Sequence, residues 1–133
     1  MADKILLEVV TPSMLALKEE VDEVVAPGKL GEFGVLPGHV PFITLLMPGD
    51  LRYTKGGVER TYIISGGVAE VREDKVNILT DSVEDPAIIH IESARMELEA
   101  ILEELKNFGG NKKEFEELNR RLRLAQARAS VKE

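Results

Sequence analysis

The 133-residue sequence contains no cysteine and no tryptophan, and only 5% of its residues are aromatic. Without cysteine the chain has no disulfide framework, no thiolate ligand for a metal and no cysteine nucleophile. No apolar run approaches the roughly 20 residues that a membrane-spanning helix needs. The first residues lack the basic start, long apolar core and small-residue cleavage site of a signal peptide. These absences favour a soluble protein of a reducing compartment, which can still reach a membrane through an embedded partner.

Basic residues are outnumbered by acidic ones. Lys and Arg total 17 and Asp and Glu total 24, which gives a net charge of −7 and an isoelectric point near 5.0. This balance argues against a nucleic-acid partner of the usual kind. The hydrophobic content of 44% is ordinary for a globular protein. The length suits one domain, or one small domain with an appendage.

Motifs of catalysis are also missing. The sequence has neither a GxxxxGK[ST] nor a GxGxxG pattern. Its two histidines, His39 and His90, are far apart, and no second histidine or cysteine lies near either of them to complete a metal site. No serine stands in a nucleophile-elbow context. We therefore predict no metal, no cofactor and no catalytic centre, and an enzyme that uses Glu32 and His39 is the less favoured alternative.

Residues 1–84 read as a β domain. Short β-rich runs with closely spaced turn signals are typical of a sandwich or barrel, and the pairs at 56–57 and 73–74 mark two hairpins. Residues 42–47 are apolar apart from one threonine, so we expect them to be buried on both faces. We also expect residues 48–50 to turn the chain and residues 65–67 to break the strand that precedes them.

The stretch 31–42, GEFGVLPGHVPF, contains three glycines and two prolines. It predicts a stiff loop between strands, with a type II turn at Pro37 and Gly38 and a new strand after Pro41. Glu32 and His39 are the polar groups of this loop. A solvated carboxylate and a contact to a partner protein explain Glu32 equally well at this point.

The hydrophobic period changes after residue 86. Apolar residues recur at alternating steps of three and four from 91 to 108 and again from 115 to 129, which predicts two helices. Gly109 and Gly110 should cap the first helix and join the two as an antiparallel hairpin, and Ser82 or Asp85 should cap its start. The apolar stripes bury too little to offset the chain entropy comfortably. We therefore expect the hairpin to need a partner surface and to be able to change it.

Positive charge gathers at the end of the chain. From residue 119 onward only Glu133 is acidic. The basic residues of this segment are Arg120, Arg121, Arg123, Arg128 and Lys132. Basic residues near a helix C-terminus complement the helix dipole. Three arginines within four residues exceed that need and favour an acidic protein surface or a phosphate as the target.

Four short sequence motifs occur in an order that is typical of one protein family. They are G-E-x-G at 31–34, P-G-H-x-P at 37–41, P-G at 48–49 and S-G-G-x-x-E-V at 65–71, and a helical hairpin follows them. Together they resemble the epsilon subunits of F-type ATP synthases, over the entire chain. Neither the first pair of blocks nor the S-G-G block is specific alone.

The resemblance implies a flattened β-barrel or sandwich of about ten strands at 1–84, followed by two antiparallel helices at 85–133. It implies a non-catalytic central-stalk (rotor) subunit of the proton-translocating, ATP-synthesising complex. The implied partners are the gamma subunit, the c-ring and the alpha/beta catalytic head. The implied location is peripheral, on the cytoplasmic face of a bacterial inner membrane, with membrane association only through the complex.

The resemblance also implies roles for particular residues. Glu32, with Phe33 beside it, contacts the c-ring, and His39 lies in the region that faces gamma and the c-ring. When the hairpin extends into the catalytic head, its basic residues meet acidic loops of the beta subunits and block ATP hydrolysis. The candidates for this inhibitory contact are Arg120, Arg121, Arg123 and Arg128.

Some bacterial members bind ATP on the folded hairpin through an I-D-x-x-R-A block, and the corresponding residues here are 91–96, IESARM. Ile91, Glu92 and Arg95 are therefore candidate ATP contacts. Glu replaces Asp, Met replaces Ala, and no arginine follows one to two turns on. A plain Glu92–Arg95 pair on the helix surface is the competing interpretation.

One alternative comes from another functional class. A free-standing β domain that binds a small ligand or carbohydrate, with a helical dimerisation tail, fits the same element pattern. It predicts an accessible pocket and a stable lone homodimer.

Overall fold

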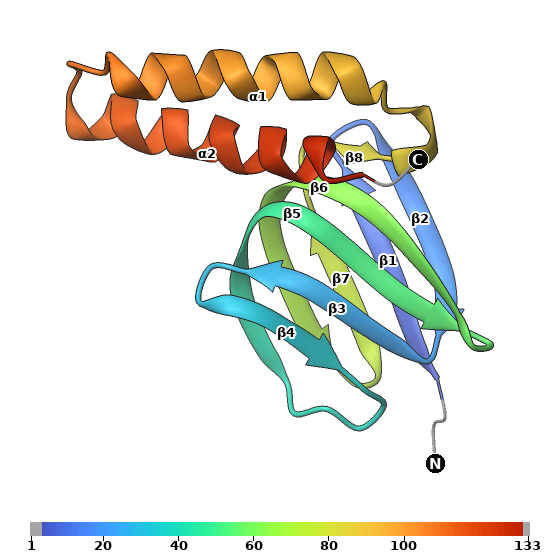
Figure 1. The fold of residues 1–133 in the computed structure, drawn as a ribbon. Coiled ribbons are helices and arrows are strands. Elements are labelled where there is room, and N and C mark those ends of the chain that lie inside the picture. Colours follow the sequence, from blue (N-terminus) through green and yellow to red (C-terminus); the bar gives the residue numbers. More distant parts are fainter. Residues whose placement is uncertain (1–3, 132–133) are drawn as a thin grey trace.

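The computed structural model describes residues 4–131, which form a curved sheet and a helical hairpin (Figure 1). Lys132 and Glu133, which entered the charge count above, lie outside this range. The elements are β1 (Ile5–Thr11), β2 (Met14–Val21), β3 (Glu23–Gly28), β4 (Gly31–Val35), β5 (Phe42–Lys55), β6 (Val58–Arg72), β7 (Lys75–Leu79), β8 (Val83–Glu84), the 3-10 turn η1 (Pro86–Ile88), α1 (Ile91–Lys106) and α2 (Lys112–Ala129).

All the strands belong to one sheet, in the order β2-β1-β7-β6-β5-β3-β4, with β8 paired to β6. Every pair is antiparallel except β1 with β7. The long strands β5 and β6 curve, and the sheet wraps around a single apolar core. The core is lined by alternate residues of β1, β3, β5, β6 and β7, among them Leu7, Val24, Leu51, Ile64 and Ile78.

The prediction of about ten strands was wrong, because the described residues form eight. The expected turn at 48–50 and the expected break at 65–67 both lie inside continuous strands. Gly66 and Gly67 have φ angles of 101° and 132°, and β6 continues through them with no register shift against β5. A Cβ on Gly67 would lie 1.8 Å from the Leu79 carbonyl oxygen, so the backbones approach too closely there for any side chain.

The stretch 31–42 is only partly the loop that its composition predicted. Residues 31–35 form the edge strand β4, which pairs with β3 and buries Val35 in the core. The type II turn is confirmed, since the His39 N–H donates to the Leu36 carbonyl at 3.1 Å and Gly38 has φ 82°. The strand forms because β3 offers an unpaired edge, which glycine content alone could not reveal.

The expectation that residues 42–47 are buried on both faces was also wrong. The side chains of Ile43 and Leu45 are 69% and 53% exposed, whereas Leu46 is buried. The strand alternates because Ile43 and Leu45 lie outside the core, and the nearby helix α2 leaves more than half of Leu45 exposed. Both predicted hairpin turns are confirmed, with positive φ at Gly56, Gly57, Glu73 and Asp74.

The two helices are confirmed, and their shared core consists of Ile101, Leu118 and Ala125 with Leu98, Leu105, Phe108 and Leu122 around it. Their predicted caps were wrong in part. Asp85 caps η1 through the Ala87 N–H, because this extra turn stands before α1. Asn107, and neither glycine, is the C-cap residue of α1, and Asn111 begins α2 with a capping box.

The hairpin lies across one end of the β domain (Figure 1). Helix α2 packs against β5 and β6, and α1 packs on the far side of α2. The β domain therefore supplies the partner surface that the hairpin needs. Strand β4 and the turn that follows it lie toward the opposite end of the domain, so the predicted sites fall into two separate regions.

Candidate interaction sites at the two ends of the β domain

Glu32 is an exposed carboxylate that has a charged neighbour within the chain. It forms an ion pair with Arg52 of β5, with 2.7 Å between Oε1 and Nη2. The Arg52 Nε is buried, and no hydrogen-bond partner for it occurs among residues 4–131. The Glu32 side chain remains 58% exposed. Arg52 thus holds Glu32 in one place while leaving a carboxylate oxygen for a partner.

A second carboxylate lies beside this pair. Burial raises the pKa of Asp50, with a smaller contribution from the Glu32 charge, and Arg52 opposes this rise. Asp50 and Arg52 are two residues apart on β5, so they share a face of the strand. Neither Asp50 nor Arg52 was identified from the sequence as a neighbour of Glu32. The position of Arg52 on the outer face of a predicted hairpin could have marked it as a candidate.

His39 occupies the last position of the type II turn. Its Nδ1 lies 2.7 Å from the Val40 carbonyl oxygen, and its ring is 5.1 Å from the ring of Phe42. Phe42 meets Phe33 edge-on at 5.2 Å. The Gly38 N–H donates to the Asp74 carboxylate at 2.6 Å, which fastens the turn to the β6–β7 hairpin. Phe33 and His39 therefore belong to one rigid aromatic group.

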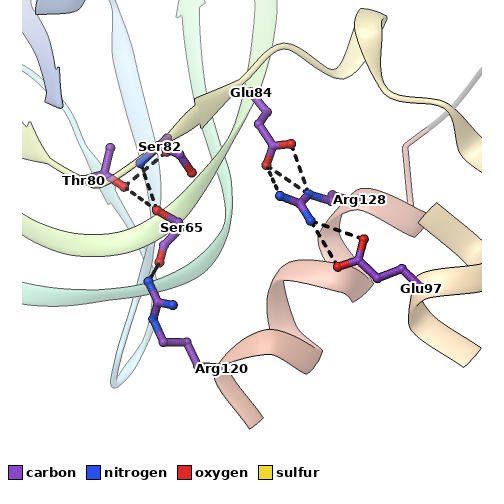
Figure 2. Close-up of polar contacts among 7 residues, drawn as sticks. All are labelled: Ser65, Thr80, Ser82, Glu84, Glu97, Arg120 and Arg128. Atoms are coloured by element: carbon purple, nitrogen blue, oxygen red, sulfur yellow. Dashed lines mark hydrogen bonds and ion pairs between the residues drawn. The ribbon is translucent and has the colours of Figure 1, made fainter. Parts of the chain in front are cut away.

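Arg120 anchors the middle of α2 to the sheet. Its Nη2 donates to the Ser65 carbonyl at 2.9 Å (Figure 2), and Asp81 lies 4.0 Å away. Ser65 is buried, pairs with Ser82 through its backbone N–H, and accepts the Ser82 N–H at its Oγ. Thr80 adds a further hydroxyl contact to Ser65. Ser65 therefore has a structural role and offers no nucleophile geometry.

Arg121 contacts α1, whereas Arg123 lines the same groove as Arg120. Arg121 bonds to Glu104 of α1 at 3.0 Å, within the hairpin. Arg123 makes no ion pair or side-chain hydrogen bond with any residue in the described part of the chain. It lines a groove of about 830 Å³ between α2 and the sheet, with Lys29, Leu45 and Asn119 also in its wall.

Arg128, in the last turn of α2, joins three elements (Figure 2). Its Nε and Nη2 lie 3.0 and 2.9 Å from the Glu84 carboxylate of β8. Its Nη1 lies 3.3 Å from Glu97 of α1. We call Arg128, Glu84 and Glu97 the clasp. Sequence reasoning found the arginine but neither of its partners, because no spacing rule joins residues 31 and 44 positions apart.

The candidate ATP residues stand at the start of α1. Ile91 is buried, whereas Glu92 and Arg95 are exposed. The competing Glu92–Arg95 ion pair does not occur in the structure of residues 4–131. Within the same residues, no cluster of three or more His, Asp or Glu side chains is arranged to hold a metal ion.

An apolar strip lies on the outer side of the sheet, and two of its residues also line the groove beside α2. It consists of the exposed Ile43, Leu45 and Leu79 on β5 and β7. A hollow of about 200 Å³ beside it is lined by Val10, Ile43, Val68 and Leu79 together with two polar residues. Exposed apolar patches of this kind mark protein contacts.

Comparison with known proteins now decides the family. A sequence profile described as "ATP synthase, Delta/Epsilon chain, beta-sandwich domain" matches residues 4–86. The chain is 45% identical to the ATP synthase epsilon chain of Syntrophobacter fumaroxidans, over all of this chain and 98% of that one. It is 43% identical to the epsilon chain of Geotalea daltonii, over 98% and 95% of the two. The chain belongs to the ATP synthase epsilon family.

Solved structures agree with this family. A chain of the Euglena gracilis mitochondrial ATP synthase, in a structure of OSCP, F1 and the c-ring, superposes with a TM-score of 0.82 at 27% identity. The match covers 96% of this chain and 80% of that one. A chain from the central stalk and c-ring of the Tetrahymena thermophila mitochondrial enzyme shares the fold, with a TM-score of 0.65 at 14% identity and 96% and 97% coverage.

The family membership confirms the predicted resemblance, the β-sandwich with two following helices, and the prediction of a non-catalytic subunit of ATP synthase. None of the helices within residues 4–131 is both long and apolar enough to span a membrane.

Proposed function

We propose that this chain is the central-stalk subunit that couples gamma to the c-ring and inhibits ATP hydrolysis through its C-terminal helices. The observation that carries the proposal is the division of candidate sites between opposite ends of one β domain, in a chain of the epsilon family. One end carries the fixed Glu32 carboxylate, and the other carries the arginine-rich hairpin.

The c-ring contact is assigned to the end that holds Glu32, Phe33 and His39. Support comes from rigidity, because an ion pair, an edge-on aromatic contact and a turn fastened by Asp74 all restrain these side chains. A preformed surface loses little entropy when it binds. Such a surface suits a rotor contact that must transmit torque without deforming.

The gamma contact is assigned to the apolar strip and to the adjoining His39 turn. Ile43, Leu45 and Leu79 expose apolar area, and exposed apolar patches commonly mark protein–protein contacts. The strip and the c-ring end lie on one continuous sheet, so the same rigid body can join two partners.

Inhibition is assigned to residues 85–133, and stalk binding to residues 1–84. Arg120, Arg121, Arg123 and Arg128 supply a row of charge for acidic loops of the beta subunits. Three of the four pair with groups inside the compact chain, so inhibition requires the hairpin to leave the β domain. We place the whole subunit on the cytoplasmic face of the inner membrane, held there by its partners.

The test is ATP hydrolysis by a purified alpha–beta–gamma core, with and without this chain, together with a gamma pull-down. We expect binding and a reduced rate of hydrolysis. Binding without inhibition would keep the stalk role and remove the inhibitory one. Failure to bind a cognate gamma would overturn the proposal, and the ligand-binding alternative, which would use the groove beside α2, would then take first place.

A further inference from the structure

The clasp is a polar contact between the hairpin and the β domain. The Arg128 side chain is 25% exposed and that of Glu84 is 27% exposed, so water screens this pair less than it screens the other ion pairs of the hairpin. Two guanidinium nitrogens face the Glu84 carboxylate, an arrangement that is among the stronger charge-assisted contacts in proteins.

The clasp also joins the β domain to both helices of the hairpin. Glu84 stands on β8, which pairs with β6 of the sheet, and Glu97 stands on α1. Arg128 near the end of α2 therefore ties the last strand of the β domain to both helices at once (Figure 2). Neither helix can swing away from the sheet while all three side chains keep their contacts.

The other polar contacts of the hairpin are either more exposed to water or lie within the hairpin itself. Arg120 donates to a neutral carbonyl and lies 4.0 Å from Asp81, whose side chain is largely exposed. Arg121 and Glu104 both belong to the hairpin, so their pair survives when the hairpin moves as a unit. The clasp is thus the one tie between sheet and hairpin, among the described ion pairs, in which the arginine is mostly shielded from water.

We propose that Glu84 and Glu97 act as a release clasp, in which they occupy the donors of Arg128 that an acidic partner would need. This inference rests on the proposed inhibitory function and deepens it. Compact docking and binding of Arg128 to a partner carboxylate exclude one another, because Glu84 and Glu97 already use the edges of the guanidinium that a partner would approach. The two glutamates therefore oppose inhibition even though they never meet the inhibited subunit.

The first experiment measures opening in the isolated full-length chain. Because the chain has no cysteine, spin labels can be placed at Glu20→Cys on β2 and Gln126→Cys on α2, both exposed. Their distance distribution is recorded by double electron–electron resonance. We expect the Glu84→Gln/Glu97→Gln variant to increase the open fraction about tenfold, since it removes charge-assisted bonds and keeps the volume of both side chains.

The control variant is Glu59→Gln/Glu99→Gln. It removes the same two charges, one from the sheet and one from α1, at exposed positions with no ion pair in residues 4–131. We expect the control to behave as the parent chain does. Equal opening in the two double variants would overturn the clasp, and circular dichroism of both would establish that the helices and sheet are intact.

The second experiment adds the catalytic head and measures hydrolysis. The clasp variant should inhibit at a concentration several-fold lower than the parent chain, because Arg128 is released and still present. Arg128→Ala should open as readily and inhibit less. If the clasp variant opens but inhibits no more strongly, compact docking does not compete with binding of Arg128 to the partner. This result would overturn the proposal and count against the inhibitory function. Absence of opening would overturn the clasp whatever the hydrolysis result.

Discussion

Arg52 of β5 holds the carboxylate of Glu32 on β4 at 2.7 Å, although β3 lies between these two strands in the sheet. The contact explains how an exposed glutamate on an edge strand can have a defined position. It also places a positive charge directly behind the proposed c-ring contact. A partner at this end therefore meets a fixed dipole of two charges, with the negative end outward.

Glu32→Gln should weaken binding to a purified c-ring about tenfold, because the amide loses the charge while keeping the shape. Arg52→Gln should weaken it as well, since Glu32 then loses its restraint, and Arg52→Lys should retain part of the affinity. Affinity can be measured by biolayer interferometry on detergent-solubilised rings.

The charge-swapped variant Glu32→Arg/Arg52→Glu separates position from pairing. It restores an ion pair, so the melting temperature should stay near that of the parent chain. It also presents a positive charge to the c-ring in place of the negative one, so binding should stay weak. Recovery of ring binding in the swapped variant would contradict the assigned role of Glu32 and leave only a structural pair.

The raised pKa of Asp50 predicts a dependence of stability on pH. Burial disfavours the charged carboxylate in the folded chain, so the folded state keeps this proton to a higher pH than the unfolded chain does. The pKa of Asp50 in the unfolded chain is 3.8. The contribution of Asp50 to stability is therefore present below pH 3.8 and is lost as pH rises through the folded-state pKa. Asp50→Asn should remove this part of the pH dependence.

Urea unfolding of the parent chain and of Asp50→Asn, at several pH values from 3 to 7, tests this sign. We expect the substitution to be more favourable at pH 7 than at pH 3. The opposite trend would show that the attraction of Arg52, and not burial, dominates at Asp50.

Gly67→Ala should destabilise the β domain by about 3 kcal/mol or more, because the new Cβ would lie 1.8 Å from the Leu79 carbonyl oxygen at a φ of 132°. Gly57→Ala is the matched control, since its φ is also positive, at 79°, and no atom stands within 4 Å of the added Cβ. It should cost only about 1 kcal/mol. Equal losses in urea unfolding would contradict the close approach of β6 and β7 at Gly67.

Arg123→Ala should weaken inhibition of ATP hydrolysis several-fold and leave folding nearly unchanged. Arg123 is the proposed inhibitory arginine whose side chain makes no ion pair or hydrogen bond in residues 4–131, so its removal breaks none in the compact state. The melting temperature should match that of Lys113→Ala, a control in the first turn of α2. Loss of stability without loss of inhibition would remove Arg123 from the inhibitory surface.

ATP binding by Ile91, Glu92 and Arg95 stays a prediction. The longer Glu92 and the missing second arginine lead us to expect affinity no better than millimolar. Calorimetric titration with Mg-free ATP should show weak heat that Arg95→Ala removes. No heat at millimolar ATP would exclude this site, and heat that persists in Arg95→Ala would place the nucleotide elsewhere.

The sequence by itself determined the elements whose signals are local. The step of three and four from residue 91 onward set both helices, and the Gly56–Gly57 and Glu73–Asp74 turns set both hairpins. Such patterns act over a few residues, where backbone conformation and side-chain period follow directly from residue type. The motif blocks also identified the family, and the comparisons confirmed it.

Only the tertiary structure decided what depends on distant neighbours. Residues 65–67 look like a break, yet pairing with β5 carries the strand through them. Residues 42–47 look buried, yet the side chains of Ile43 and Leu45 stay more than half exposed. Arg128 finds Glu84 across 44 positions, and Arg120 finds Ser65 across 55. These outcomes follow from how the curved sheet and the hairpin meet, because long-range packing alone brings such groups within bonding distance.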